Sequence, residues 1–261
     1  MMLTTAGKDK DPNFDLKKDL IGNLGDDFIQ YEKAPKSTKV EDLQQSPTLT
    51  LIGSPNPARL LDALRMITSL LPPPLSTAPL QEREYLGKKI YSLSMAAMPQ
   101  AGAEGDENAE NQDEAGVKTQ KFSFTSSGGY LAFSTDDAML ENFLRSGENP
   151  PKPLRAAPGF AEAAQKAGGM DNGFFTYENQ AESIRFTMEL MKSNPEAFHR
   201  VVFLSARSGE NAEGIGRLFN LELLPGFDRI AKYFGIAVAS ATTTPDGFVM
   251  KAVAPKPAGL K

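Results

Sequence analysis

Apolar side chains recur every three or four residues in several stretches and predict amphipathic helices there. The clearest stretch follows Asn56 and Pro57, with Leu60, Leu64 and Ile67 on one side. Asn accepts hydrogen bonds from the free amides of a first turn, and Pro at that position has no N–H to leave unpaired. The predicted helices cover residues 15–24, 56–71, 135–146, 160–167, 179–194 and 225–234.

Short runs with alternating or β-branched apolar residues predict strands between these helices. The run 27–33 places Phe28 on one side and Ile29 and Tyr31 on the other, so the pattern does not determine which face of this strand is buried. Glycines at 128 and 129, and the Pro245-Asp246-Gly247 sequence, predict tight hairpin turns. The predicted strands cover residues 27–33, 47–53, 85–94, 119–125, 130–134, 172–178, 236–241 and 248–253.

The order of these elements predicts an α+β fold of two lobes, in which mostly antiparallel strands and hairpins pack against amphipathic helices. The Pro-rich segment 150–153 is stiff and polar, and it is the best candidate boundary. The first lobe is expected to cover residues 13–147 and the second residues 148–255. Apolar residues within 198–226 predict further short buried helices in the second lobe.

One long segment, residues 96–117, contains almost no large apolar side chain and is rich in Ala, Gly, Glu, Asn, Asp and Gln. It cannot bury enough surface to offset the entropy lost on ordering, so we interpret it as a mobile acidic insertion at a hairpin tip. A calcium site or a partner-binding tail is the alternative. The segment lacks the Asp-x-Asp-x-Asp-Gly spacing of a calcium loop, which favours a solvated loop.

Charge and cysteine content narrow the function classes. The 261 residues carry a formal net charge of −5, and no basic run occurs. Proteins that bind nucleic acids or anionic membrane surfaces do so with clustered Lys and Arg side chains, so neither is an expected partner of this chain. The chain has no cysteine. Thiolate nucleophiles, disulfides, iron–sulfur clusters and zinc ribbons are therefore excluded.

A serine triad or a zinc site would have to depend on His199, the one histidine of the chain. A single His without Cys cannot build the usual zinc shell, and no Gly-x-Ser-x-Gly motif is present. The serine-rich glycine segments 125–128 and 205–209 lack the strand–turn–helix setting that such a nucleophile needs. We interpret His199 as a structural or surface residue.

Two further segments could carry chemistry. Residues 208–216 are glycine-rich and open a predicted helix, which could indicate a phosphate-binding loop. They follow no clear strand, and the chain has no Gly-Lys-Ser or Gly-Lys-Thr sequence. We therefore interpret them as a turn before a capped helix. Paired carboxylates remain possible among the 33 acidic residues. Asp26 and Asp27 lie between a helix and a strand, where a solvated turn is expected.

No stretch approaches the ~20 apolar residues of a membrane-spanning helix. Residues 1–12 are polar and lack the basic and then apolar profile of a signal peptide. If the natural protein is exported, we expect this chain to begin downstream of its export signal.

Six segments occur in a characteristic order along the chain: residues 14–26, 54–64, 85–91, 129–136, 158–161 and 174–179. Their order resembles a broad family of bacterial exported proteins, the domain of unknown function family thirty-three fifty-two, in its Verrucomicrobia-like and Planctomycete-like members. The resemblance implies a bacterial, periplasmic or other cell-envelope setting, and the chain looks like the C-terminal portion of such a protein. It gives no catalytic, cofactor-binding or metal-binding residues to carry over.

Two functions remain open at this point. The first, which we favour, is a non-catalytic envelope-associated module that binds a protein, a peptide or a surface polymer, in a groove between its lobes. The second is a hydrolase that uses carboxylates alone, with or without a divalent ion held by oxygen ligands. No residue is assigned to a catalytic, cofactor or metal site under either hypothesis, and no cofactor is expected.

Overall fold

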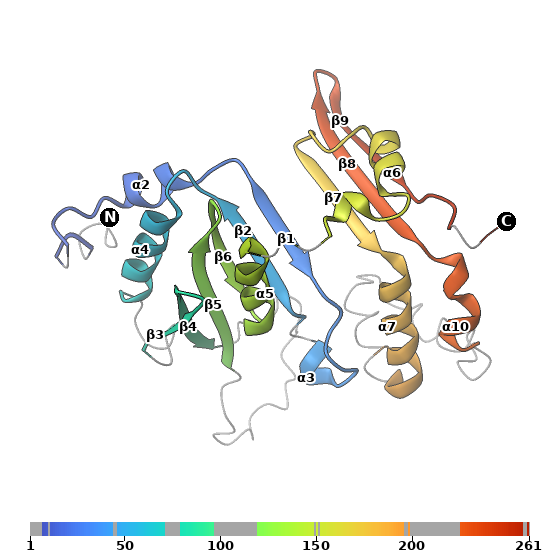
Figure 1. Cartoon of the computed structure of the whole chain (residues 1–261), viewed down its shortest axis with the longest axis horizontal. Helices are drawn as coiled ribbons and strands as arrows, with labels where there is room; N and C mark the ends of the chain where they lie inside the picture. Colours follow the sequence, from blue (N-terminus) through green and yellow to red (C-terminus); the bar gives the residue numbers. More distant parts are fainter. Residues whose placement is uncertain are drawn as a thin grey trace, which may run out of the picture. The chain divides into compact units, whose positions relative to one another are not determined.

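The chain divides into two compact units in a computed structural model (Figure 1). Unit 1 comprises Met1–Lys33 and Gln45–Pro150, and unit 2 comprises Ala34–Gln44 and Pro151–Lys261. The structure describes residues 7–9, 11–43, 46–70, 79–96, 119–148, 150, 152–195, 198, 225–257 and 260. Within this part of the chain, no helix combines the length and the apolar composition that a bilayer crossing requires.

Unit 1 is built on a six-stranded sheet in which every neighbouring pair is antiparallel. The strand order is β1-β2-β6-β5-β4-β3, so β1 and β3 are the two edges. The strands are β1 Phe28–Glu32, β2 Thr48–Gly53, β3 Gln81–Tyr85, β4 Lys88–Ala96, β5 Thr119–Ser127 and β6 Tyr130–Ser134.

The helices of unit 1 begin where the sequence supplies a cap. The Asn56 side chain accepts a hydrogen bond from the Arg59 N–H at 3.1 Å and precedes α4, Pro57–Thr68. The Asp136 side chain accepts one from the Met139 N–H at 3.0 Å and precedes α5, Asp137–Glu148. Two short elements precede the first strand, α2 Leu16–Asp19 and the 3₁₀ turn η1 Ile21–Asn23.

Helices α4 and α5 cover opposite faces of the six-stranded sheet. The apolar residues of α5 pack on one face, with Leu49 of β2 and Ala132 of β6. The apolar residues of α4 pack on the other face, with Phe124 of β5 and Leu131 of β6. Because Ala132 and Leu131 are consecutive on one strand, their side chains point to opposite faces. The sheet is therefore the middle layer of unit 1.

Unit 2 contains a three-stranded antiparallel sheet in the order β7-β8-β9. Phe160 of α6 is 1% exposed and contacts the rings of Phe175 and Tyr177, and Val238 of β8 completes this core. The elements are α3 Val40–Leu43, η3 Leu154–Ala156, α6 Phe160–Ala167, β7 Phe174–Asn179, α7 Gln180–Ser193, α10 Phe227–Ile230, η5 Ala231–Tyr233, β8 Ile236–Thr244 and β9 Gly247–Val253.

The α+β class and most predicted elements are confirmed, with several differences in their bounds. The predicted helix 15–24 is two short pieces, and the predicted helix 225–234 consists of α10 followed by η5. Helix α4 ends at Thr68, and α5 continues through Gly147 to Glu148. The predicted strand 85–94 is wrong at its start, because a turn at Leu86 and Gly87, both with positive φ, joins β3 to β4.

Residues 34–44 group with unit 2, whereas the sequence analysis places them in the first lobe. Hydrogen bonds to the end of α7 explain this assignment. The Ser193 hydroxyl donates to Thr38 Oγ1 at 2.7 Å, and the Asn194 side-chain amide donates to the Thr38 carbonyl at 3.1 Å. These partners are more than 150 positions apart in the sequence, so no local pattern predicts them.

Candidate functional site

Strand β1 presents a row of exposed apolar side chains at one edge of the six-stranded sheet. Phe28 is 65% exposed, Ile29 47% and Tyr31 53%, and Gln30 and Glu32 between them are also exposed. Strand β2 beside it is largely shielded, with Leu49 buried in the core. Exposed large apolar residues gathered on one edge strand are a feature of binding surfaces.

The register of β1 shows which of its backbone groups are not hydrogen-bonded to β2. The Gly53 N–H donates to the Asp27 carbonyl at 2.8 Å, and the Lys33 N–H donates to the Pro47 carbonyl at 3.0 Å. Bonded positions alternate along an antiparallel pair, so Ile29 and Tyr31, between these two, also bond to β2. The N–H and C=O groups of Phe28, Gln30 and Glu32 therefore point outward from the sheet.

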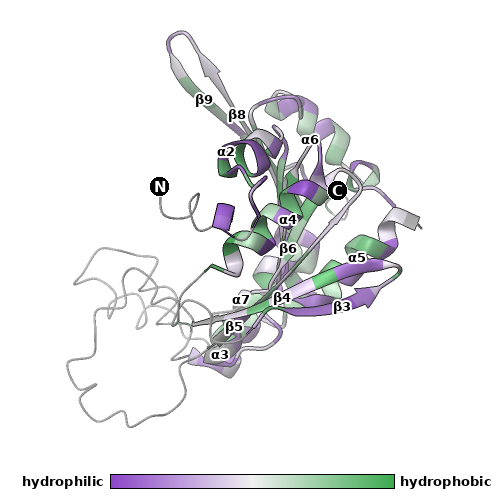
Figure 2. Ribbon diagram, turned by 90° about the vertical axis from the view of Figure 1, so that its left-hand side faces the viewer, coloured by the Kyte–Doolittle hydropathy of each residue, from purple (hydrophilic) through white to green (hydrophobic). Residues whose placement is uncertain are grey.

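The opposite edge of the same sheet is protected in a way that β1 is not. Strand β3 has the sequence Gln-Glu-Arg-Glu-Tyr and appears as a hydrophilic ribbon in Figure 2. The register of β3 with β4 shows that the backbone N–H and C=O groups of Glu82 and Glu84 point away from β4. Lys89 forms an ion pair with Glu82 at 2.7 Å. Charged residues at these positions discourage another strand from pairing. Among the residues that the structure describes, β1 is therefore the edge of this sheet that is open to strand addition.

A close approach of two glycines fixes the beginning of β1. The Gly25 N–H donates to the Gly53 carbonyl at 2.7 Å. A Cβ atom at Gly25 would lie 2.8 Å from the Gly53 oxygen and 2.9 Å from its carbonyl carbon, closer than Cβ atoms come to backbone. The absence of a side chain at Gly25 thus allows the chain to enter β1 directly beside the end of β2.

The two faces of β1 differ in the side chains that they present. Ile29 and Tyr31 lie beside Leu51 and Leu49 of β2, so they extend the apolar row of the α5 face to the edge. Phe28 lies on the α4 face together with Gln30 and Glu32, because alternate residues of a strand share a face. The edge is thus apolar on both faces and carries a carboxylate at its C-terminal end.

Asp26 and Asp27, which the sequence analysis assigns to a solvated turn, immediately precede β1. The Tyr130 hydroxyl donates to Asp27 Oδ2 at 3.4 Å, and both aspartates are exposed. Burial, and after it the neighbouring Asp27, raises the pKa of the Tyr130 hydroxyl. The two aspartates therefore place two carboxylates at the N-terminal end of the edge.

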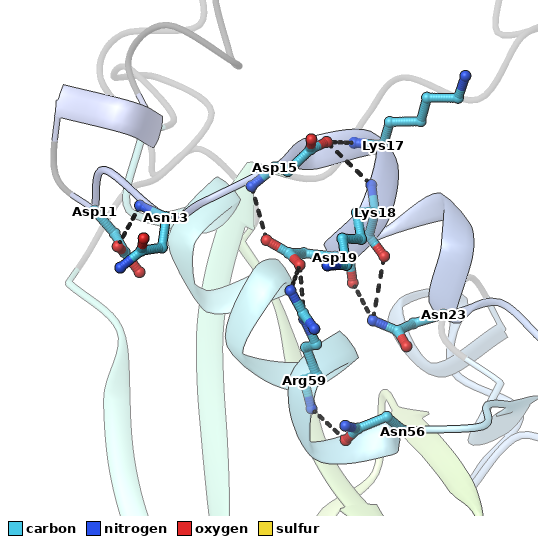
Figure 3. Close-up of polar contacts among 9 residues, drawn as sticks. All are labelled: Asp11, Asn13, Asp15, Lys17, Lys18, Asp19, Asn23, Asn56 and Arg59. Atoms are coloured by element: carbon cyan, nitrogen blue, oxygen red, sulfur yellow. Dashed lines mark hydrogen bonds and ion pairs between the residues drawn. The ribbon is translucent and has the colours of Figure 1, made fainter.

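The buried carboxylate of Asp19 belongs to a structural network that joins α2 to α4 (Figure 3). The Asp15 N–H donates to Asp19 Oδ2 at 2.8 Å, and Arg59 Nε donates to Oδ1 at 2.6 Å. The Asn23 side-chain amide donates to the Asp19 carbonyl at 2.9 Å. The Asp15 N–H, and after it the Arg59 guanidinium, holds the pKa of the Asp19 carboxyl below its ordinary value of 3.8.

Replacing Asp19 with Asn should therefore lower the free energy of unfolding at neutral pH by about 1–3 kcal/mol, because Arg59 and the Asp15 amide lose a charged acceptor. The lowered pKa means that this stabilisation is complete above about pH 3.8 and is lost as the pH falls through the lowered value. Urea unfolding at pH 7 and at pH 2–3 measures the difference between the two proteins at each pH.

Asp62→Asn is the matched control for that measurement. Asp62 lies on α4, the helix that carries Arg59, and pairs with Arg65 at 3.2 Å, but its side chain is 69% exposed. Exposed pairs contribute little, so the control should change the free energy of unfolding by less than about 0.5 kcal/mol. Equal effects of Asp19→Asn and Asp62→Asn would contradict the structural role of Asp19.

Asp137, at the start of α5, is the centre of a second polar cluster. Lys121 Nζ donates to its Oδ2 at 2.7 Å and Ser123 Oγ donates to its Oδ1 at 2.6 Å, while Ser92 Oγ lies 2.8 Å from Ser123 Oγ. Partial burial alone would raise the pKa of Asp137, but the hydrogen bonds from Lys121 and Ser123 outweigh it and lower the pKa. The cluster ties α5 to β4 and β5.

The other candidates of the sequence analysis fall in two groups. The serine-rich segment 125–128 ends β5 and turns directly into β6, so a strand rather than a helix follows it. His199 and the segments 205–209 and 208–216 lie outside the described residues. So does the acidic insertion beyond residue 96. Within the described ranges, no three His, Cys, Asp or Glu side chains gather in a way that could hold a metal ion.

The edge at β1 is the site that sequence reasoning missed. The local signal was present, since Phe28, Ile29 and Tyr31 put large apolar side chains on both faces of a short strand. Such a strand is either fully buried or exposed at an edge, and the sequence does not say which, because strand order depends on distant segments.

Comparison of this chain with protein-family models, with curated proteins and with solved structures finds no match.

Proposed function

We propose that this chain is a non-catalytic module that binds an extended peptide segment of a partner protein as an additional strand beside β1. The observation that carries the proposal is the combination of outward backbone groups at Phe28, Gln30 and Glu32 with three exposed large apolar side chains on the same strand. Strand addition obtains affinity from main-chain hydrogen bonds and specificity from alternate side chains.

The side chains of the edge define the chemistry of the peptide. A strand of at least five residues would match the length of β1. On the α5 face its side chains would lie beside Ile29 and Tyr31, which favours apolar residues at alternate positions. The carboxylates of Asp26 and Asp27 at the N-terminal end of β1 favour a Lys or Arg at one end of the peptide, whereas Glu32 at the other end is followed by the exposed Lys33. The proposed ligand is thus an apolar peptide strand with a basic residue at one end.

The cellular setting of this proposal is the bacterial cell envelope. Its support is the resemblance of segments such as 14–26 and 54–64 to exported proteins, together with the negative net charge, which suits a basic peptide partner. The alternative of a carboxylate-dependent hydrolase has no specific support in the described residues. Asp19 and Asp137 have lowered pKa values and act as anions that hold helices in place, whereas a general acid needs a raised pKa.

Selection from a displayed library of random ten-residue peptides tests the proposal with a defined probe. The wild-type chain should enrich peptides that alternate apolar residues and carry Lys or Arg at an end. Gln30→Pro should then weaken binding of a selected peptide by at least about tenfold, since Pro removes an outward N–H that the partner strand needs. The substitution leaves the bonds between β1 and β2 intact, because the Gln30 N–H does not take part in them.

Glu84→Pro is the matched control, because it removes an outward N–H from the opposite edge strand β3. It should leave the affinity for the selected peptide within about twofold of the wild-type value. Failure to enrich any peptide would overturn the proposal. Equal binding by wild type and Gln30→Pro would overturn it as well, as would equal losses in Gln30→Pro and Glu84→Pro.

A further inference from the structure

The backbone groups of β1 favour one direction for a peptide that is added beside it. Phe28, Gln30 and Glu32 each direct one N–H and one C=O outward from the sheet. In an antiparallel pair, opposed residues exchange both hydrogen bonds, so a peptide of five residues, the length of β1, satisfies all of these groups. A parallel strand bonds each residue of β1 to two positions of the peptide and needs about seven residues to do the same. Antiparallel addition therefore makes more hydrogen bonds per peptide residue.

Asp27 continues the α5 face of β1 by one position toward the N-terminus. It lies opposite Gly53 of β2, because the Gly53 N–H donates to its carbonyl and Ile29 follows opposite Leu51. Gly53 in turn lies opposite Tyr130 of β6. The three residues therefore form one row across β1, β2 and β6, which lie side by side in Figure 1.

The middle member of this row, Gly53, leaves room between Tyr130 and Asp27. A Cβ atom at Gly53 would lie 2.9 Å from the Asp27 Cβ atom. Without that atom the Tyr130 hydroxyl reaches across β2 and donates to Asp27 Oδ2 at 3.4 Å. The contact places the Asp27 carboxylate on the face that also presents Ile29 and Tyr31, because alternate residues of a strand share a face. The α5 face of the edge thus consists of two apolar side chains and an anion.

We propose that the peptide bound at β1 runs antiparallel to it and carries Lys or Arg at its sixth position, a specificity that rests on the proposed function. Position one of the peptide is the residue opposite Glu32. Positions two and four then lie opposite Tyr31 and Ile29, and position five lies opposite Phe28. Position six follows opposite Asp27. The preferred peptide is therefore apolar at positions two, four and five and basic at position six.

The register makes the pair at position six a close one. Asp27 and Ile29 bond to β2 rather than outward, so an antiparallel neighbour meets them in non-hydrogen-bonded pairs, whose Cα atoms approach to about 4.5 Å. Opposite charges in directly opposed pairs stabilise a sheet, and like charges destabilise it. At the other end of the edge, Glu32 is followed by the exposed Lys33, whose charge opposes that of Glu32. The charge of the edge therefore favours a base toward the C-terminus of the peptide.

A nitroxide attached at the C-terminus of the tightest displayed peptide measures the direction. In the complex it should broaden the NMR amide signals of Asp27 and Phe28 more strongly than that of Lys33, because an antiparallel strand ends beside the start of β1. A nitroxide at the peptide N-terminus should give the opposite pattern. Stronger broadening at Lys33 from the C-terminal label would overturn the direction and leave strand addition intact. Binding that survives Gln30→Pro would instead overturn the proposed function.

Asp27→Lys measures the selection of the basic residue. Exchanging the Lys at position six of the peptide for Glu should weaken binding to the wild-type chain by about fivefold at low ionic strength. The same exchange should strengthen binding to Asp27→Lys by a similar factor, because the charge opposite position six is then reversed. Asp27 is exposed, so the variant should keep the wild-type circular dichroism spectrum.

Asp246→Lys is the matched control, because it makes the same change at an exposed aspartate of unit 2. It should leave the preference for Lys over Glu at position six within about twofold of the wild-type value. An unchanged preference in Asp27→Lys would overturn selection by Asp27. So would an equal change of preference in Asp27→Lys and Asp246→Lys, or displayed peptides that carry their base at the N-terminal end of the apolar pattern.

Discussion

Replacing Phe124 with alanine is expected to lower the free energy of unfolding by about 3–5 kcal/mol. Phe124 is 2% exposed and lies on β5 in the middle of the sheet of unit 1, with ring centroids 5.8 Å from those of Tyr91 and Phe133. Its removal takes away these ring contacts and leaves a cavity beneath α4, where Leu60 and Leu61 pack. Chemical denaturation followed by circular dichroism measures the loss.

Phe28→Ala is the matched control for that experiment, because it removes the same side chain from the same face of the same sheet. Phe28 is 65% exposed, so its loss should change the free energy of unfolding by less than about 0.5 kcal/mol. A large loss of stability in Phe28→Ala would show that the residue packs in the core. That result would contradict both the exposure of the edge and its availability to a peptide.

The contrast between the two edges of unit 1 gives the functional proposal its physical basis. Folded proteins protect edge strands with charges, and β3 follows this rule with Glu82, Glu84 and the Lys89 ion pair. Strand β1 does not follow it, although an exposed edge of this kind invites aggregation. Departures from such a rule concentrate at functional sites, which is why we assign binding to β1.

Local signals predicted most helix starts because the cap residues act within one turn. Asn56 and Asn179 each accept a hydrogen bond from the N–H three residues ahead, as their positions before apolar runs indicate. The end of α6 was equally predictable, since Gly168 adopts a φ of 112° that other residues rarely take. These features depend on neighbours in sequence, so a single sequence contains them.

The turn between β3 and β4 was not predictable in the same way. Its first position is Leu86, a residue with a φ of 49°, where turn chemistry leads one to expect Asn, Asp or Gly. The strand before it, Gln81–Tyr85, is largely polar because it is an edge, so it lacks the apolar alternation that marks a strand. The sequence therefore predicted a single strand starting at Tyr85.

The candidate site at β1 could not be predicted from the sequence for a related reason. Whether β1 is central or at an edge depends on strand order, and β2 takes its second neighbour, β6, from about 80 positions further along the chain. No local pattern encodes that choice. The apolar residues of β1 were visible in the sequence, but their exposure followed only from the assembled sheet.

Hydrogen exchange at the backbone of β1 tests the proposed strand addition most directly. In the free chain the amides of Ile29 and Tyr31 should exchange slowly, because they bond to β2, and those of Phe28, Gln30 and Glu32 should exchange rapidly. With the tightest displayed peptide bound, the account predicts that exchange at Phe28, Gln30 and Glu32 slows by at least about tenfold. Unchanged exchange at these three amides in the saturated complex would contradict it.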